Sequence, residues 1–269
     1  MKRADGSLVK DEVPMYYLIP HFLTKKYDAM NMVTVDIPVE PLRKYMNEKR
    51  KEGYHISHIA LFLAAYIKAV QKYPALNRFI VNRRIYQHND FTVSMVVLRP
   101  GEDNDTFSKI YFDLTENIFE VQKKIDEYIS ENRKDNNAND LDKTMDKLVS
   151  MNWLVRVAVN ILRFADYHNM LPKSLIKASP FHASLLLSNL ASIRTNHIYH
   201  HVYEFGTTSI GITMGNLREI PKRTKDGVML ERSLPLGVVM DERICSGHYF
   251  ATAFNFVKEL LSDPRRLEA

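Results

Sequence analysis

Charged side chains collect at one point near the C-terminal end of the sequence. An apolar run begins at Leu234 and stops abruptly at Asp241-Glu242-Arg243, and a helical pattern opens at Gly247. A strand before a sharp turn and a helix after it can hold reactive side chains rigidly in a cleft. This turn is therefore the first candidate for the place where the protein could carry chemistry.

Glu242 has two interpretations at this turn. A carboxylate is a weak general base unless burial raises its pKa well above the ordinary value of about 4.3. Beside Asp241 and Arg243, Glu242 could instead be half of an ion pair that closes the turn. Paired charges are common where a strand meets a helix, so the sequence favours this second interpretation.

Two adjacent histidines are further candidates for a base. His200 and His201 end the segment Asn196-His-Ile-Tyr-His-His201, and Glu242 could orient one of them as a carboxylate orients a catalytic imidazole. Alternatively, the pair lies in a subunit contact or makes ordinary hydrogen bonds in a loop. No third ligand follows at helical or hairpin spacing, so the sequence does not favour a metal site.

The C-terminal segment resembles the catalytic domain of the 2-oxoacid dehydrogenase complex acyltransferases, a family related in fold to chloramphenicol acetyltransferase. That family ends with a strand, the motif Asp-His-Arg-x-x-Asp-Gly, a helix and a Leu-x-x-Pro-x-x-Leu tail. The matching segments are Asp241-Glu-Arg-Ile-Cys-Ser-Gly247 and Leu261-Ser-Asp-Pro-Arg-Arg-Leu267. The resemblance implies that Glu242 replaces the catalytic histidine and Ser246 replaces the supporting aspartate, so the motif is altered.

The resemblance extends to two segments outside this motif. Tyr73-Pro-Ala-Leu-Asn-Arg-Phe79 matches a Tyr-Pro-x-Leu-Asn segment of the family, and Ser188-Asn189-Leu190 matches its Ser-Asn-Leu-Gly element, with Ala191 in place of the glycine. By this resemblance Ser188 donates a hydrogen bond to the tetrahedral oxyanion, a contribution of up to ~3 to 4 kcal/mol. The resemblance also implies that the His200-His201 pair runs beside the active-site channel.

Two functions follow from the resemblance. The first is acyl transfer between coenzyme A and a small acceptor, run by an altered site of Ser188, Glu242 and one histidine of the pair, with Asp241, Arg243, Gly247 and Asn189 as motif support. The second is a catalytically inactive trimer that binds acyl-coenzyme A or a protein partner. In both, the family implies a homotrimer with sites between subunits, coenzyme A as substrate and no covalently bound cofactor.

The composition is that of an ordinary globular protein. The chain has 269 residues, of which 45% are hydrophobic and 26% charged, with a net charge of +5. The basic residues are scattered among acidic ones, so we expect no nucleic-acid binding. No stretch is apolar for long enough to cross a membrane. The single cysteine, Cys245, excludes an internal disulfide, suits the reducing cytoplasm and is more typical of a small buried hydrophobe than of a nucleophile.

Interleaved helical and strand patterns predict an α/β two-layer sandwich of the chloramphenicol acetyltransferase type, with a mixed sheet flanked by helices. We expect an arm over residues 1–30 and one domain over residues 31–269, acting without the further modules of a dehydrogenase complex. Residues 134–141 are polar enough for a loop, and a helix is expected over 143–150. The apolar helix expected over 153–167 is an addition to the family pattern, packed on the sheet or under a loop.

Overall fold

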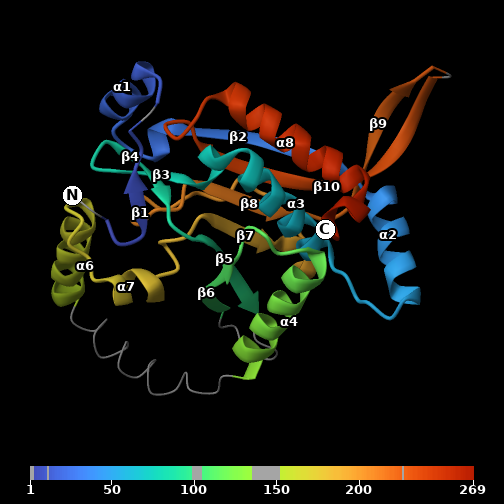
Figure 1. Ribbon diagram of the computed structural model, residues 1–269, viewed down its shortest axis with the longest axis horizontal. Helices are drawn as coiled ribbons and strands as arrows, with labels where there is room; N and C mark the ends of the chain where they lie inside the picture. The colour runs from blue at the N-terminus through green and yellow to red at the C-terminus, as the bar shows by residue number, and fades with distance from the viewer. Residues whose placement is uncertain (1–2, 11, 99–104, 135–151, 226) are drawn as a thin grey trace.

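The computed structural model describes residues 3–10, 12–98, 105–134, 152–225 and 227–269 and contains one large mixed sheet (Figure 1). The strand order is β2-β10-β8-β7-β5-β6, and β9 pairs with β10 beyond the edge of the sheet. Only the pairings of β7 with β5 and with β8 are parallel. The mixed sheet is therefore as predicted. The strands are β2 (Met30–Pro38), β5 (Phe91–Leu98), β6 (Asp105–Phe112), β7 (Leu185–Asn189), β8 (Ile210–Met214), β9 (Arg218–Thr224) and β10 (Gly227–Asp241).

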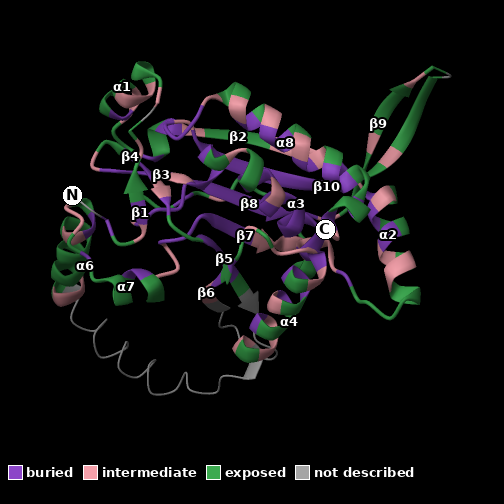
Figure 2. Ribbon diagram, in the orientation of Figure 1, coloured by how far each residue is buried: buried purple, intermediate pink, exposed green. Residues whose placement is uncertain are grey.

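Helices cover one face of this sheet and enclose the core with it, as Figure 2 shows by their buried surfaces. They are α2 (Val39–Lys51), α3 (His58–Lys72), α4 (Ile118–Lys134) and α8 (Gly247–Ser262). The most buried is α3, whose residues from Ala60 to Ile67 are all buried. Its N-cap is Ser57, because the Ser57 hydroxyl accepts a hydrogen bond from the amide of Ala60.

The other face of the sheet is crossed by the segment over residues 195–203. Core side chains alternate along β8 and β10, so Gly211, Gly215 and Gly237 present their Cα hydrogens to the face away from the core. A Cβ built on Gly237 would lie 2.2 Å from the carbonyl oxygen of Ile198, and one on Gly215 would lie 2.1 Å from the amide nitrogen of His197. These glycines therefore let the segment lie directly on the strands.

The N-terminal residues form a second, three-stranded sheet with the order β1-β4-β3. The strand β1 (Gly6–Leu8) comes from the expected arm and pairs antiparallel with β4 (Arg84–His88), which pairs with β3 (Arg78–Val81). The arm also contains the helix α1 (Pro14–Phe22). Neither β1 nor α1 was indicated by a clean period in the sequence, because β1 has only 3 residues and α1 is mostly apolar with Pro20 inside it.

Two helices stand beside the three-stranded sheet at the end of the molecule where Figure 1 marks the N-terminus. The longer, α6 (Asn152–Tyr167), is the predicted additional helix, and α7 (Lys173–Ala178) follows it. Buried charges fix α6: Arg3 Nη2 lies 2.5 Å from Asp166 Oδ1, and His182 Nε2 lies 3.3 Å from the same oxygen. The loop and helix expected over residues 134–141 and 143–150 lie outside the described residues, apart from Lys134, which ends α4.

The C-terminal half differs from the sequence prediction in two places. The separate strands expected at Val228 and at Leu234 are one continuous strand, β10, and β9 was not expected because charged residues and Pro221 dominate its sequence. β9 and β10 pair antiparallel as a hairpin, with Thr224 opposite Gly227. Short 3₁₀ helices occupy Tyr27–Ala29, Pro74–Asn77, Leu190–Ile193 and Pro264–Leu267.

Candidate functional site

The turn after β10 is held by a buried ion pair between Asp241 and Arg243. Arg243 donates from Nε to Asp241 Oδ1 at 2.8 Å and from Nη2 to Asp241 Oδ2 at 2.7 Å, and its backbone amide donates to Oδ1 at 3.1 Å. A third side-chain bond reaches the carbonyl oxygen of Leu23. Both residues are almost fully buried, so the pair locks the direction of the chain as it enters α8.

Glu242 lies between these two residues but takes other partners. Its backbone amide donates to the carbonyl oxygen of Ala29 at 2.9 Å, and its carboxylate accepts a hydrogen bond from Asn31 Nδ2 at 2.7 Å. The ion pair at the turn is therefore made by Asp241 and not by Glu242. The carboxylate of Glu242 is half exposed and keeps one oxygen that accepts no hydrogen bond from a described residue.

Ser246 and Gly247 form the start of α8. The Ser246 hydroxyl accepts a hydrogen bond from the amide of Tyr249 at 3.2 Å and is the N-cap of the helix. Nothing lies within 4 Å of a Cβ built on Gly247. Cys245 is buried, and burial raises the pKa of its thiol far above the ordinary range, so it is no nucleophile in this conformation.

Ser188 lies at the end of β7 on the face away from the core. Leu185 and Leu187 point into the core, so Ser188 points to the face crossed by residues 195–203. Its neighbour Asn189 ends the strand, and both side chains are half-buried. A hydroxyl held at this position on a paired strand is rigid enough to act as a preorganised donor.

The two candidate histidines contact each other. His200 Nδ1 lies 2.8 Å from the carbonyl oxygen of His201, and the two rings stack with centroids 4.6 Å apart. A carbonyl oxygen only accepts, so Nδ1 of His200 carries the hydrogen and Nε2 of the neutral ring keeps its lone pair. The ring of His201 also meets Tyr203 edge-on. Neither histidine is hydrogen-bonded to Glu242 among the residues described.

The strand register separates Ser188 from Glu242 within one chain. Ser188 is level with Thr213 of β8, and Thr213 is level with Gly237 of β10. Glu242 follows Gly237 by five residues, which places it about 17 Å further along the strand direction. The carbonyl of His200 lies over Gly211, between these two levels. A single chain therefore does not bring the predicted oxyanion donor and the predicted base together.

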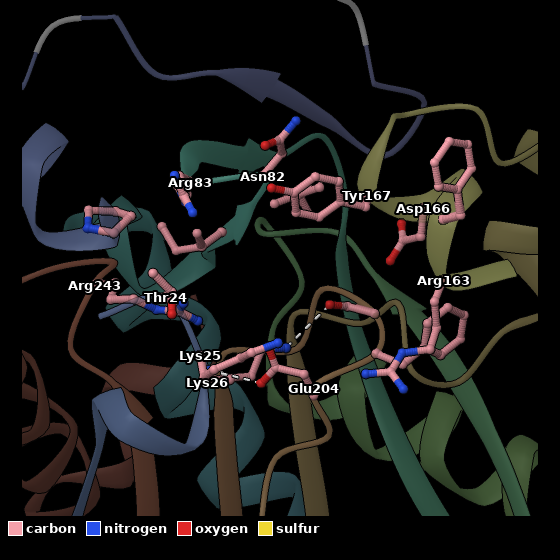
Figure 3. Close-up of a pocket in the computed structure, with 16 residues that line it drawn as sticks. Thr24, Lys25, Lys26, Asn82, Arg83, Arg163, Asp166, Tyr167, Glu204 and Arg243 are labelled. Carbon is pink, nitrogen blue, oxygen red and sulfur yellow. Dashed lines mark hydrogen bonds between the residues drawn. The ribbon is translucent and has the colours of Figure 1, made fainter. Parts of the chain in front are cut away.

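A cavity of about 430 Å³ opens beside the turn, and no local sequence pattern indicates it. Figure 3 shows that Arg83, Arg163, Lys25 and Glu204 surround it, with Arg243 on one side and Tyr167 on another. Its walls come from the chain after α1, the β3–β4 turn, α6 and the loop before β8. The lining residues are Pro20, Thr24, Lys25, Lys26, Ile80, Val81, Asn82, Arg83, Arg163, Phe164, Asp166, Tyr167, Glu204, Phe205, Gly206 and Arg243.

Lys26 is the buried cation of this cavity. Its ammonium group donates to three carbonyl oxygens, those of Tyr203 at 2.9 Å, Gly206 at 3.2 Å and Thr208 at 3.0 Å. Burial lowers the pKa of Lys26 to about 8, and the charges of Asp241 and Glu204 act in the opposite direction. Lys26 therefore fixes the loop over residues 203–208 to the chain that follows α1.

No group of three or more metal-binding side chains occurs in the described part of the chain, and no helix in that part is long and apolar enough to cross a membrane. No model of a protein family matches the sequence, and no curated protein matches it. Solved structures match the whole fold.

A probable dihydrolipoamide acetyltransferase from Listeria monocytogenes is 14% identical, with a TM-score of 0.60 over 94% of each chain. The dihydrolipoamide acetyltransferase of Azotobacter vinelandii is 14% identical, with a TM-score of 0.61 over 96% of this chain and 94% of that one. A chloramphenicol acetyltransferase is 12% identical, with a TM-score of 0.52 over 95% of this chain and 99% of that one.

These matches define the class of the fold. The chain has the chloramphenicol acetyltransferase-like fold of the 2-oxoacid dehydrogenase acyltransferase cores, which confirms the predicted architecture. The Azotobacter work concerned the role of a serine, a histidine and an asparagine in the catalytic mechanism of that enzyme. At 14% identity the match shows the fold alone, so the chemistry of this chain has to be argued from its own residues.

Proposed function

We propose that this protein binds coenzyme A or acyl-coenzyme A and transfers the acyl group to a small acceptor, at sites completed between the subunits of a homotrimer. The proposed site combines Ser188 of one subunit with Glu242 and His200 or His201 of a neighbour. We place the protein in the cytoplasm, where its one thiol, Cys245, stays reduced. No nucleic acid and no membrane span belong to this proposal.

The observation that carries the proposal is the position of Ser188 and Glu242 in the fold. Both side chains stand at strand ends of the acyltransferase fold, but the register places them about 17 Å apart along one chain. Residues so far apart act on one carbonyl group only if a second subunit brings them together. A symmetric oligomer supplies that juxtaposition once at every interface.

The chemistry divides among three groups. A base, His200 Nε2 or the Glu242 carboxylate, removes the proton from the acceptor, whose nucleophilic atom attacks the carbonyl carbon of the thioester. The Ser188 hydroxyl donates to the oxyanion as the tetrahedral intermediate forms. The intermediate collapses, the bond from carbon to sulfur breaks, and the protonated base returns its proton to the thiolate of coenzyme A.

A second function is favoured by a specific observation, namely that both altered motif positions have structural partners. Glu242 accepts from Asn31, and Ser246 caps α8. These contacts stabilise the fold whether or not the protein catalyses a reaction. The alternative is therefore a catalytically inactive trimer that binds acyl-coenzyme A or a protein partner on the same fold.

Release of free thiol from acetyl-coenzyme A separates these two functions. We expect the wild-type protein to release thiol above the blank and Ser188→Ala to lose about 100-fold of that rate, the usual effect of removing one oxyanion donor. Ser192→Ala is the matched control, because Ser192 is exposed a few residues further on and bonds only to the carbonyl of Asn189. Equal rates for wild type and blank would favour the inactive trimer.

Mixing two inactive variants tests whether the site lies between subunits. Ser188→Ala and Glu242→Gln chains, each inactive alone, are expressed together, so that random trimers contain interfaces with both native residues. We expect about a quarter of the wild-type rate to return, since each interface takes its serine from one subunit and its glutamate from the other. No recovery in confirmed mixed trimers would contradict a site that takes Ser188 from one subunit and Glu242 from another.

A further inference from the structure

The cavity described above lies at the end of the molecule that the additional helix α6 builds. Arg163, Phe164 and Tyr167 of α6 form one wall, and Asn82 and Arg83 of the β3–β4 turn form another (Figure 3). Neither Ser188 nor the histidine pair lines it. A volume of about 430 Å³ lies within the range of small-molecule sites.

The charges around the cavity are unbalanced. Lys25, Arg83 and Arg163 are exposed side chains at its edge, and none of the three forms an ion pair with a residue that the structure describes. The two acidic residues of the lining already have partners. Asp166 is bound by Arg3 and lies beside His182, and Glu204 accepts from the backbone amide of Lys26 at 2.8 Å.

The buried cations of the lining are also satisfied. Lys26 donates to three carbonyl oxygens, and Arg243 is neutralised by Asp241. The excess positive charge at the mouth therefore belongs to Lys25, Arg83 and Arg163. Three cations that face one space repel each other, and an anion between them relieves that repulsion. Guanidinium groups suit phosphate in particular because they donate two parallel hydrogen bonds.

Aromatic side chains complete the lining. Phe164 and Tyr167 are both on α6, have exposed fractions of 61% and 44%, and both contact the ring of His168. Phe205 also lines the cavity, and its ring meets His182 edge-on. Exposed aromatic faces next to cations bind flat ring systems by stacking, as in sites that hold a base beside its phosphates.

We propose that this cavity is a binding site for a ligand that joins phosphate groups to a flat heteroaromatic ring, that is, an adenosine phosphate group or a close analogue. Two sources have this chemistry: the phosphoadenosine end of coenzyme A, and a free nucleotide. The first source rests on the proposed function, whereas the second is independent of it.

Calorimetric titration of the full-length protein with 3′,5′-adenosine diphosphate tests the site. We expect binding that weakens about tenfold in Arg163→Ala and again in Arg83→Ala, because each guanidinium removes charge-assisted hydrogen bonds. Arg156→Ala is the matched control, since Arg156 is exposed two turns earlier on the same helix and does not line the cavity. If Arg156→Ala weakens binding as much as Arg163→Ala does, binding depends on the general positive charge of the surface and not on this cavity, and the proposal is overturned.

The ring is tested separately from the phosphates. Phe164→Ala should weaken 3′,5′-adenosine diphosphate severalfold and leave inorganic pyrophosphate unchanged. Arg163 and Phe164 are both exposed, so the circular dichroism and thermal unfolding of Arg163→Ala and Phe164→Ala should match those of the wild type. Pyrophosphate binding as tightly as the nucleotide would overturn the assignment of a ring-bearing ligand.

The two sources are distinguished by titrating coenzyme A and adenosine triphosphate into the same variants. Weakening of coenzyme A by Arg163→Ala assigns the cavity to the phosphoadenosine end of the acyl carrier. If coenzyme A binds Arg163→Ala and Arg83→Ala as tightly as the wild type, the proposed function still stands but coenzyme A does not occupy this cavity. The cavity is then a nucleotide site only if the free nucleotides bind the wild type tightly and bind these two variants more weakly. No binding of any of these ligands overturns the proposal.

Discussion

The turn after β10 and the helix α6 are fixed in different ways. The turn is fixed by the ion pair of Asp241 with Arg243, which is almost inaccessible to solvent. Among the described residues, the helix α6 is attached through the contacts of Asp166 with Arg3 and His182. Its other side exposes Trp153, Val157, Ile161 and Phe164.

This difference separates the part of the molecule that the fold class requires from the part that is particular to this chain. The strand, turn and helix around Asp241–Gly247 belong to the main sheet and the helices that cover it, and the buried ion pair leaves the turn little room to move. The additional helix is free to carry a new surface, and the cavity beneath it draws Arg163 and Tyr167 from that helix. We expect substitutions at the turn to act on the whole domain and substitutions on α6 to act locally.

The largest effect is expected for Asp241→Asn. The substitution leaves the guanidinium of Arg243 buried without a counter-ion, which costs about 3 to 5 kcal/mol of unfolding free energy. Urea denaturation measures this loss. Glu231→Gln is the control, because its partner Lys222 is half exposed on the hairpin and the pair should contribute little. A loss as small as that of the control would mean that the turn is not fixed by its ion pair.

A smaller loss, of about 2 to 3 kcal/mol, is expected for Asp166→Asn. Arg3 keeps its second partner, Asp5, so one buried cation is not left alone. The substitution should increase local unfolding of α6 more than that of the rest of the domain, and faster hydrogen exchange of the α6 amides would detect this. Asp28→Asn, on an exposed side chain, is the control. Exchange that rises uniformly through the domain would contradict the local attachment of α6.

The same carboxylate predicts a pH dependence of stability. Burial raises the pKa of Asp166, but the adjacent His182 ring, 3.3 Å away, and the charge of Arg3 outweigh it and hold the pKa below the ordinary value of 3.8. The unfolded chain therefore binds this proton at a higher pH than the folded one. The stabilisation is complete above the unfolded pKa of about 4 and is lost as the pH falls through the folded pKa. Unfolding curves at pH 6 and pH 3 should differ less in Asp166→Asn.

Loss of the helix cap by Ser246→Ala should cost about 1 kcal/mol. Ser246→Asp should keep the cap, because aspartate accepts the same hydrogen bond from Tyr249.

Because Ser246→Asp keeps the cap, the double substitution Glu242→His with Ser246→Asp tests the motif without loss of helix stability. We expect the pair to raise thiol release by more than the product of the rate changes caused by the single substitutions, as groups that act as one unit do. Independent effects would show that the two positions are uncoupled.

The smallest effect on unfolding is expected for Ile161→Ser, within about 0.5 kcal/mol, because the side chain is 62% exposed. Thermal unfolding at two protein concentrations measures it. A large loss of unfolding free energy that depends on protein concentration would show that another copy of the chain covers this face of α6. The side chains of α6 would then be buried in an interface, as those of the turn after β10 are buried in the domain.

The sequence by itself determined the elements of the frame. Alternating apolar residues specified β2 and β5, helical periodicity specified α3, α4, α6 and α8, and the cap at Ser57 follows from a hydroxyl placed before an apolar helical run. These signals are local, since each depends on residues a few positions apart. The motif at Asp241–Gly247 was also recognisable, because a strand end and a helix start are both encoded within it.

Only the tertiary structure decided the contacts of the site. The charges at the turn allowed Arg243 to pair with Glu242 or with Asp241, and the direction of the strand end selected Asp241. The distance between Ser188 and Glu242 depends on the register of three strands, which no local pattern contains. The cavity draws its cations from Lys25, Arg83 and Arg163, residues separated by many positions in the sequence, so it exists only once the chain has folded.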